Sequence, residues 1–135
     1  MLVFVHGIFA AAFILFVLGA LFFDFIAILR PPRFYARIAF VCALFALLSF
    51  VALAGIGGIL ASHVQISTAA GVSQLHRHII MASETILLLL LTWLIRLTLG
   101  RYRFRMILYF VLEIAVLAIA ILTAHYGTLV AFLKP

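Results

Sequence analysis

Apolar residues fill four long stretches of the 135-residue chain, and short polar segments separate them. A helix that crosses a membrane needs about 20 mostly apolar residues. Each stretch exceeds that length, so we expect the helices to tilt or to extend past the hydrocarbon. The pattern therefore predicts four membrane-spanning helices, at about residues 2–29, 35–60, 75–99 and 104–132.

The segments between these stretches contain residues that end helices. Two prolines in "RPPRFYAR" cannot continue the first helix. A polar loop at 61–75, "SHVQISTAAGVSQ" in its centre, separates the second helix from the third, which Gly100 closes. Because short connections make neighbouring helices antiparallel, we expect an all-α, up-down-up-down four-helix bundle that forms one domain over residues 1–135.

Composition makes a lipid bilayer the expected surroundings of this bundle. Hydrophobic residues make up 70% of the chain and charged residues only 9%, which is too little polar sequence to cover a soluble domain of this size. The first stretch has no basic residue before it and is far longer than a secretory core. We therefore interpret it as an uncleaved helix and not as a signal peptide.

The net charge of +6 is explained by membrane topology better than by nucleic-acid binding, because the arginines gather between apolar stretches. Only Arg77 and Lys134 lie at the opposite side. Under the positive-inside rule both termini and the 61–75 loop face outward, to the periplasm if the membrane is a bacterial inner membrane. The seven inner basic residues flank the first and third connections: Arg30, Arg33, Arg37, Arg96, Arg101, Arg103 and Arg105.

All five histidines fall at the outer end of the predicted bundle, and every helix contains or adjoins at least one. They are His6, His63, His76, His78 and His125. A haem iron with two axial imidazoles needs histidines on different helices at similar depth. Gly7 and Gly127 leave room beside two of them, and Arg77 is placed to pair with haem propionates. The chain has no CxxCH motif, so any haem is b-type.

Helical geometry limits how these histidines pair. His76 and His78 differ by about 200° around a helix, so both cannot face the core; we expect His78 to turn inward. Since the first and third helices are diagonal in a simple bundle, as are the second and fourth, His6 with His78 and His63 with His125 are the expected pairs. His6 with His125 is the alternative, and His63 in a polar loop is also interpretable as a solvated residue.

The three acids have open roles. Asp24 lies near the inner end of the first helix, where a loop arginine such as Arg33 or Arg105 is its expected partner. Glu113 sits deeper and needs a neutralising partner or a proton. Glu84 has three alternatives: it orients a ligand histidine, carries protons beside a redox site, or forms an interhelical hydrogen bond. The single cysteine, Cys42, is interpreted as a packing residue.

Three segments resemble a family of small, functionally uncharacterised bacterial four-helix membrane proteins. "VHGIFAAAFILFVLGALFFD" is similar to that family's opening helix, "LHRHIIMASETILLLLLTWLIR" to its third and "ILTAHYGTLVAF" to its last. The family often has a proline after the first histidine's turn and a double glycine near the end, where this chain has "HGIF" and "HYGT". The resemblance implies the four-helix fold and a role linked to haem or redox chemistry.

Three functions fit the sequence. The favoured one is a b-type cytochrome-like electron-transfer subunit, not a stand-alone enzyme, with one or two haems that pass electrons from a membrane quinol to other membrane or periplasmic redox subunits. The second is a cofactor-free accessory subunit of a larger respiratory or photosynthetic complex. The third, in which the five outer histidines bind copper or zinc, is weakened by the lack of thiols and methionine-rich repeats there.

Overall fold

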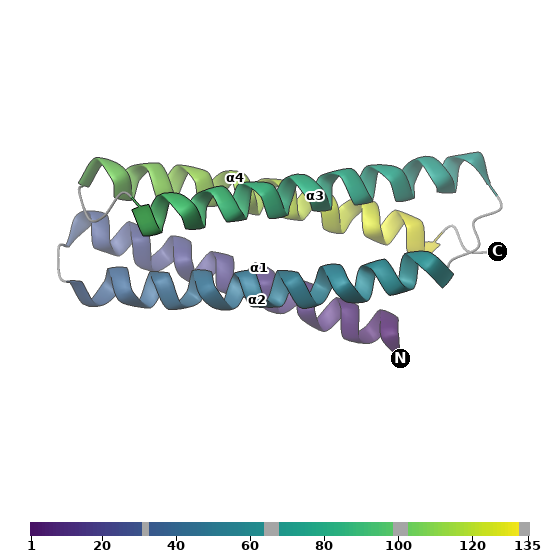
Figure 1. The fold of residues 1–135 in the computed structure, drawn as a ribbon, viewed down its shortest axis with the longest axis horizontal. Coiled ribbons are helices and arrows are strands. Elements are labelled where there is room, and N and C mark those ends of the chain that lie inside the picture. The colour runs from purple at the N-terminus through teal and green to yellow at the C-terminus, as the bar shows by residue number, and fades with distance from the viewer. Residues whose placement is uncertain (31–32, 64–67, 99–102, 133–135) are drawn as a thin grey trace.

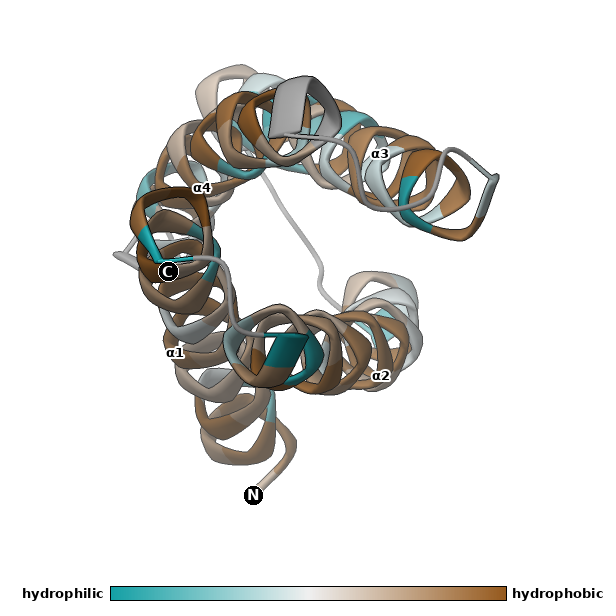
Figure 2. Cartoon of the chain, turned by 90° about the vertical axis from the view of Figure 1, so that its left-hand side faces the viewer, coloured by the Kyte–Doolittle hydropathy of each residue, from teal (hydrophilic) through white to brown (hydrophobic). Residues whose placement is uncertain are grey.

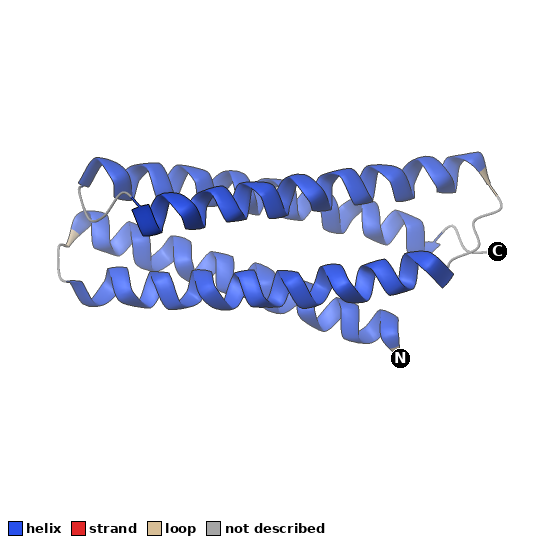
Figure 3. Ribbon diagram, viewed as in Figure 1, coloured by secondary structure: helices blue, strands red, loops and turns tan. Residues whose placement is uncertain are grey.

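The computed structural model describes residues 1–30, 33–63, 68–98 and 103–132 of the chain. Within these ranges it contains four helices and no strand (Figure 3). The helices run side by side, and the end of α1 lies near the start of α2, while the start of α1 and the end of α4 lie at the opposite end (Figure 1). The predicted all-α, up-down-up-down four-helix bundle is confirmed. In chain order the helices are α1 (Leu2–Leu29), α2 (Arg33–His63), α3 (Ala69–Thr98) and α4 (Arg103–Phe132).

The helices at the 61–75 segment are longer than the sequence predicted. The hydroxyl of Thr68 accepts a hydrogen bond from the backbone N–H of Gly71 at 3.1 Å, as an N-cap threonine does, and α3 therefore begins at Ala69. The prediction of a polar loop over the whole of 61–75 was wrong. His63 is instead the last residue of α2, and the two histidines of "LHRHII" lie in the third turn of α3.

The end of α1 follows from its sequence. Arg30 takes an extended conformation, with φ −128° and ψ 113°, and its N–H donates to the carbonyl of Ile26 at 2.7 Å. A residue before proline is driven out of the helical region by the proline ring, and Pro31 follows here. The predictions on the two prolines themselves, on Gly100 and on the topological roles of Arg101 and Lys134 fall outside the described residues.

Packing in the bundle is uneven. Helix α1 packs closely on α2 and also on α4, α3 packs on α4, and α2 and α3 barely meet. Figure 2, which looks along the bundle axis, shows this uneven spacing between the helices. The contact between α2 and α3 includes Trp93, whose ring centroid lies 4.8 Å from that of Phe40 and whose Nε1–H donates to the carbonyl of Ala43 at 3.2 Å. Trp93 is thus a packing residue between α3 and α2.

A single apolar core runs along the middle of the bundle, and α1 and α3 face each other across it only as diagonal neighbours. Phe13 of α1 and Phe50 of α2 meet edge to face, with centroids 5.0 Å apart. Buried positions recur every three or four residues, as the period of a helix requires. The buried members of the core are Phe13, Val17, Leu21, Ala46, Phe50, Leu89, Val116 and Ala120.

The outward faces of the helices are apolar as well. All four helices are long and apolar enough to cross a membrane, and Figure 2 shows hydrophobic colour over most of their outer surfaces. Leu87, Leu94 and Phe22 are among many large side chains more than half exposed. A soluble bundle exposes polar residues on this side, so the outer surface of this one is suited to lipid. The chain is a multi-pass membrane protein by this criterion.

Candidate functional site: a histidine pair across the bundle

His78 of α3 turns toward α4. Its side chain is half-buried, and Nδ1 lies 2.8 Å from the carbonyl oxygen of Thr123. A carbonyl oxygen only accepts, so Nδ1 carries the proton and donates in this hydrogen bond. The neutral ring then has its lone pair on Nε2, the nitrogen that remains available to a ligand.

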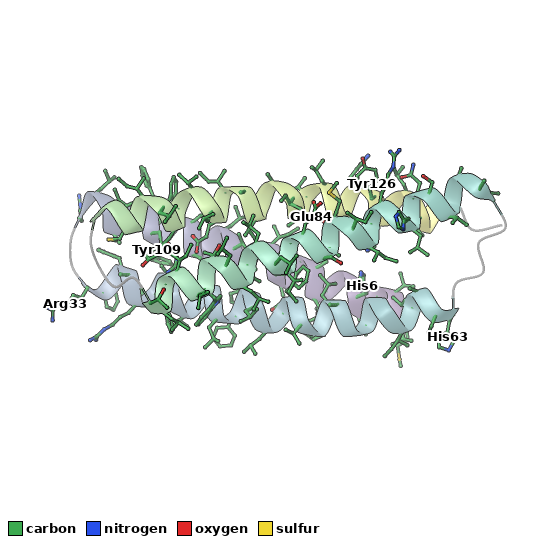
Figure 4. The ribbon with its side chains drawn as sticks, turned by 45° about the horizontal axis from the view of Figure 1, so that its top comes forward. His6, Arg33, His63, Glu84, Tyr109 and Tyr126 are labelled. Carbon is green, nitrogen blue, oxygen red and sulfur yellow. The ribbon has the colours of Figure 1, made fainter. Side chains whose placement is uncertain are left out.

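His6 of α1 is half-buried at the same end of the bundle (Figure 4). Its Nδ1 is shielded from solvent and has no hydrogen-bond partner of good geometry among the described residues. The backbone of Leu53 on α2 is the nearest polar group that interacts with it. A buried ring nitrogen without a partner is uncommon in folded proteins, and each instance calls for an explanation.

A glycine stands against each of these two imidazoles. A Cβ built on Gly57 of α2 lies 3.1 Å from Cε1 of His6, and one built on Gly127 of α4 lies 2.9 Å from Cε1 of His78. Any larger residue at these positions displaces the ring that it faces. Each histidine therefore lies directly against the backbone of the neighbouring helix, in a place that only glycine leaves open.

The two half-buried imidazoles lie at the same end of the bundle, on α1 and α3, which are diagonal helices with no close backbone approach. Each of the four helices thus contributes one residue at the same end of the bundle: a histidine from α1 and α3, and a glycine from α2 and α4. We call His6, Gly57, His78 and Gly127 the histidine cluster. Among the predicted pairs, His6 with His78 is the one whose two members are both half-buried.

The structure does not bring the other three histidines into the core. His63 is exposed, and its Nδ1 lies 2.8 Å from the carbonyl of Ile59 on its own helix. His76 and His125 are also exposed. His125 lies against the ring of Tyr126, with centroids 5.8 Å apart. Neither His63 with His125 nor His6 with His125 forms a pair across the bundle.

Arg77 is exposed on α3 beside the histidine cluster. Its guanidinium carbon lies 6.0 Å from the centroid of the Tyr126 ring on α4, at the limit of a cation–π contact. Among the residues that the structure describes, no three histidine, cysteine, aspartate or glutamate side chains form a group that could hold a metal ion. The cluster therefore offers two imidazoles, and a structural or catalytic zinc site uses three or four protein ligands.

A second polar cluster lies in the other half of the bundle. Nη2 of Arg96 on α3 donates to Oδ2 of Asp24 on α1 and, at 2.6 Å, to Oε1 of Glu113 on α4. The exposed fractions of the three side chains are only 5%, 2% and 4%. We call Asp24, Arg96 and Glu113 the ion triad. It ties three helices together through one guanidinium group.

The ion triad corrects two expectations. Asp24 pairs with Arg96, inside a helix, and not with a loop arginine such as Arg33. The sequence predicts Arg96 to be one of the basic residues that flank the third connection. Its guanidinium instead pairs with Asp24 and Glu113 inside the bundle. The guanidinium carbon also lies 5.2 Å from the ring centroid of Tyr109, whose hydroxyl donates to the carbonyl of Ile95. Spacing did not indicate this pairing, because Arg96 lies two residues from the end of α3 whereas Glu113 lies ten residues inside α4.

Glu84 belongs to neither cluster. It is exposed about midway along α3 (Figure 4), and the structure shows no hydrogen bond or ion pair to it within the described ranges. Of its three predicted alternatives, an interhelical hydrogen bond is not formed with any residue that the structure describes. The hydroxyls of Ser83 and Thr92, on the same helix as Glu84, donate to the carbonyls of Ile79 and Leu88.

Comparisons of the chain with protein-family models, with curated proteins and with solved structures gave no match. The functional assignment below therefore rests on the geometry of the two clusters and on the sequence.

Proposed function

We propose that the protein is a b-type cytochrome-like electron-transfer subunit of a membrane, and that His6 and His78 are the residues that would hold one haem b. The observation that carries this proposal is the position of two half-buried imidazoles from diagonal helices at the same end of the bundle, each against a glycine of a neighbouring helix. In helical bundles, cofactor and metal sites are built from side chains that face each other from different helices.

The residues around the histidine cluster suit ligand histidines. A histidine that binds a metal usually donates its second ring N–H to a carbonyl or carboxylate, which fixes the tautomer and the ring orientation. His78 does this to the Thr123 carbonyl at 2.8 Å. For His6, the orphaned Nδ1 near the Leu53 backbone is the corresponding atom, and a small rotation of the ring gives it the same kind of partner.

A bound haem supplies a one-electron carrier whose reduction potential depends on its axial ligands and on the dielectric of its surroundings. The protein's own part is to hold the two imidazoles in place and to exclude water with the apolar core below them. Gly57 and Gly127 keep the rings apart by letting each retreat against a helix backbone. Arg77 remains the proposed partner of the propionates, because it is the described arginine next to the cluster on α3.

One haem is favoured over two. The sequence allowed a second site at His63 and His125, but both side chains are exposed and neither faces a histidine of another helix. For the same reason a copper or zinc site that uses all five histidines is not favoured. The resemblance to the family of four-helix bacterial membrane proteins agrees with a redox role and stays a prediction.

The proposed orientation places the histidine cluster at the periplasmic face of a bacterial inner membrane, with both termini outside. Since the charge of Arg96 is neutralised within the ion triad, Arg96 is left out of the count of basic residues at the inner end. Six basic residues of the inner end then stand against Arg77 and Lys134 at the outer end, and the positive-inside rule still gives the same orientation. A periplasmic redox subunit and a membrane quinol are the partners that this orientation allows.

The test is a reduced-minus-oxidised absorption spectrum of the purified protein, combined with the ratio of haem to protein. The proposal predicts the sharp α-band of a bis-histidine haem b and about one haem per chain. Protein expressed with haem in excess that shows no such band would contradict it. The second candidate, a cofactor-free accessory subunit, would then be favoured by the extensive apolar outer surface, which a larger complex covers as readily as lipid.

A further inference from the structure

The ion triad contains two acids and one base. Nη2 of Arg96 donates both to Oδ2 of Asp24 and to Oε1 of Glu113, so the two carboxyl groups contact the same nitrogen atom. Two oxygens bonded to one donor lie no more than about 6 Å apart. Arginine stays protonated in proteins. With both acids ionised, two negative charges therefore face one positive charge, and the net charge of the triad is −1.

The described surroundings of the triad offer nothing to balance that extra negative charge. All three side chains are buried, and they belong to helices that are apolar enough to cross a membrane. Neither acid forms an ion pair with a second basic side chain in the described part of the chain. Two carboxyl groups that share a site usually keep one proton between them, because like charges in a medium of low dielectric repel strongly. Charge balance therefore calls for one proton in the triad.

One atom of the triad is suited to carry this proton. Oε2 of Glu113 is buried and has no hydrogen-bond partner among the described residues. An ionised carboxylate needs donors at both of its oxygens, and a buried charge that lacks them is costly. Nε of Arg96 is also buried without a described partner, so it does not donate to Oε2. A proton on Oε2 removes the charge that these contacts leave unsatisfied.

Other ionisable side chains near the triad do not replace the proton. On α4, Tyr109 lies one turn from Glu113, and its ring centroid is 5.2 Å from the guanidinium carbon of the triad. On α2, the thiol of Cys42 is half-buried, with Sγ against Gly19 of α1, whereas Arg37 is exposed. Neither a phenol nor a thiol supplies a positive charge.

We propose that the ion triad is a proton-binding site, in which Asp24 and Glu113 share one exchangeable proton beside Arg96. Proton uptake by a carboxylate oxygen changes the net charge of the triad from −1 to zero, and release reverses it. Asp24 stands five residues before the end of α1, about 8 Å along the axis. The proton therefore exchanges with water at the end of the bundle opposite to the histidine cluster. This site shares no residue with that cluster and does not depend on haem.

The test is infrared spectroscopy of the purified protein at pH 7, where free aspartate and glutamate are ionised. The C=O stretch of a protonated carboxyl group is separate from the bands of carboxylates. The chain has only three aspartates and glutamates, and Glu84 is the one outside the triad. In Glu84→Gln, the expected result is a single carboxylic-acid band that shifts to lower frequency after prolonged equilibration in D₂O.

Substitutions in the Glu84→Gln background change the expected number of protons. In Asp24→Asn or Glu113→Gln, one acid and one base balance without a proton, so the band is expected to disappear. In Arg96→Met both remaining acids need a proton, and the band area is expected to double. Because Arg96→Met is also expected to unfold more easily, the two amide variants decide the test. Arg77→Met, on the exposed face of α3, is the matched control and keeps the single band.

The absence of a carboxylic-acid band in Glu84→Gln would overturn the proton site. A band that persists in either amide variant would show that one acid holds its proton whatever the charge of the other, and would overturn the shared proton. A band that does not move in D₂O would overturn the exchange. The infrared readout involves no haem, so failure of the proton site leaves the haem proposal standing, and failure of the haem proposal leaves the proton site.

Discussion

The ion triad and the histidine cluster occupy opposite halves of the same bundle, and both join helices α1, α3 and α4. In the ion triad, one guanidinium donates to two carboxyl groups, and its positive charge is compensated within the protein. In the histidine cluster, one imidazole has a single hydrogen bond to a backbone carbonyl and the other has an unpartnered buried nitrogen. In the triad, three polar side chains bind one another, although Nε of Arg96 and Oε2 of Glu113 have no hydrogen-bond partner among the described residues. In the cluster, ring nitrogens remain available to a ligand.

This difference assigns structural stability to the ion triad and ligand binding to the histidine cluster. A buried ion network holds helices in register. Removing one of its members lowers the free energy of unfolding, because uncompensated charges remain buried. A pair of neutral imidazoles contributes little to stability, and its lone pairs are suited to a metal centre. We therefore expect substitutions in the triad to change folding, and substitutions in the cluster to change ligand binding while the fold survives.

The largest effect is expected for Arg96→Met. The substitution keeps an unbranched apolar stem but leaves Asp24 and Glu113 buried without a positive charge, and breaking a buried ion pair in this way costs about 3–5 kcal/mol. Unfolding of the detergent-solubilised protein, followed by circular dichroism, measures the loss. Arg77→Met on the exposed face of the same helix is the matched control and is expected to unfold as the wild type does.

The charge argument for the triad can be checked by replacing all three ionisable side chains together. The variant Asp24→Asn, Arg96→Met, Glu113→Gln has no uncompensated charge in the bundle, so it is expected to regain much of the stability that Arg96→Met loses. If the triple variant were less stable than the single one, compensation of charge would not be the role of the triad.

A smaller effect is expected when only one acid of the triad is replaced. In Glu113→Gln the guanidinium of Arg96 keeps Asp24 as its partner, and the new amide still accepts a hydrogen bond. The expected cost is about 1–2 kcal/mol, the value of a hydrogen bond to a charged group, and the same unfolding measurement gives it. If Glu113→Gln lowered the stability as much as Arg96→Met does, each acid would be as important to the triad as the arginine.

The smallest change in the chain, a single methyl group, is expected to act on the histidine cluster alone. In Gly127→Ala the new Cβ lies 2.9 Å from Cε1 of His78, so the ring has to move. We expect a shifted or weakened haem band with unfolding unchanged to within about 1 kcal/mol, since glycine in a helix interior differs from alanine by about that amount.

Gly58→Ala is the matched control for this change, because nothing lies within 4 Å of a Cβ built on Gly58. It is expected to leave the spectrum as it is in the wild type. Gly57→Ala, one residue away, is expected to disturb His6 more mildly than Gly127→Ala disturbs His78, because the contact distance is 3.1 Å. An identical response of all three variants would mean that the glycines do not seat the imidazoles.

Much of the fold could be predicted from the sequence because lipid imposes strong conditions on it. The bounds of α1 were predicted to the residue, since Pro31 leaves no freedom at its end. The end of α2 and the start of α3 were not, because "ASH" and "AAGVSQ" are compatible with either a loop or a helix. The start of α3 is set by the cap from Thr68. Polar composition alone does not distinguish a loop from a helix that emerges from the membrane.

The candidate site was predictable to a lesser degree. Rotation about a helix showed that only one of His76 and His78 faces the bundle, and the diagonal arrangement of α1 and α3 gave His6 as its partner. The exposure of His63 and His125 depends on which face of each helix points to the bundle. Spacing within a single helix gives only the angle between two of its residues, and so it does not show which face that is. The same limit applied to Arg96, whose side chain reaches inward although its position in the sequence resembles that of a topological arginine.

The central claim is that His6 and His78, and no other histidines, hold a haem. The most direct measurement compares the haem-to-protein ratio and the α-band of His6→Ala, His78→Ala, His63→Ala and His125→Ala, each purified in the same way. We predict that the first two lose the haem or its bis-histidine spectrum while remaining folded, and that the last two match the wild type. Loss of the band in His125→Ala with retention in His78→Ala would contradict the account.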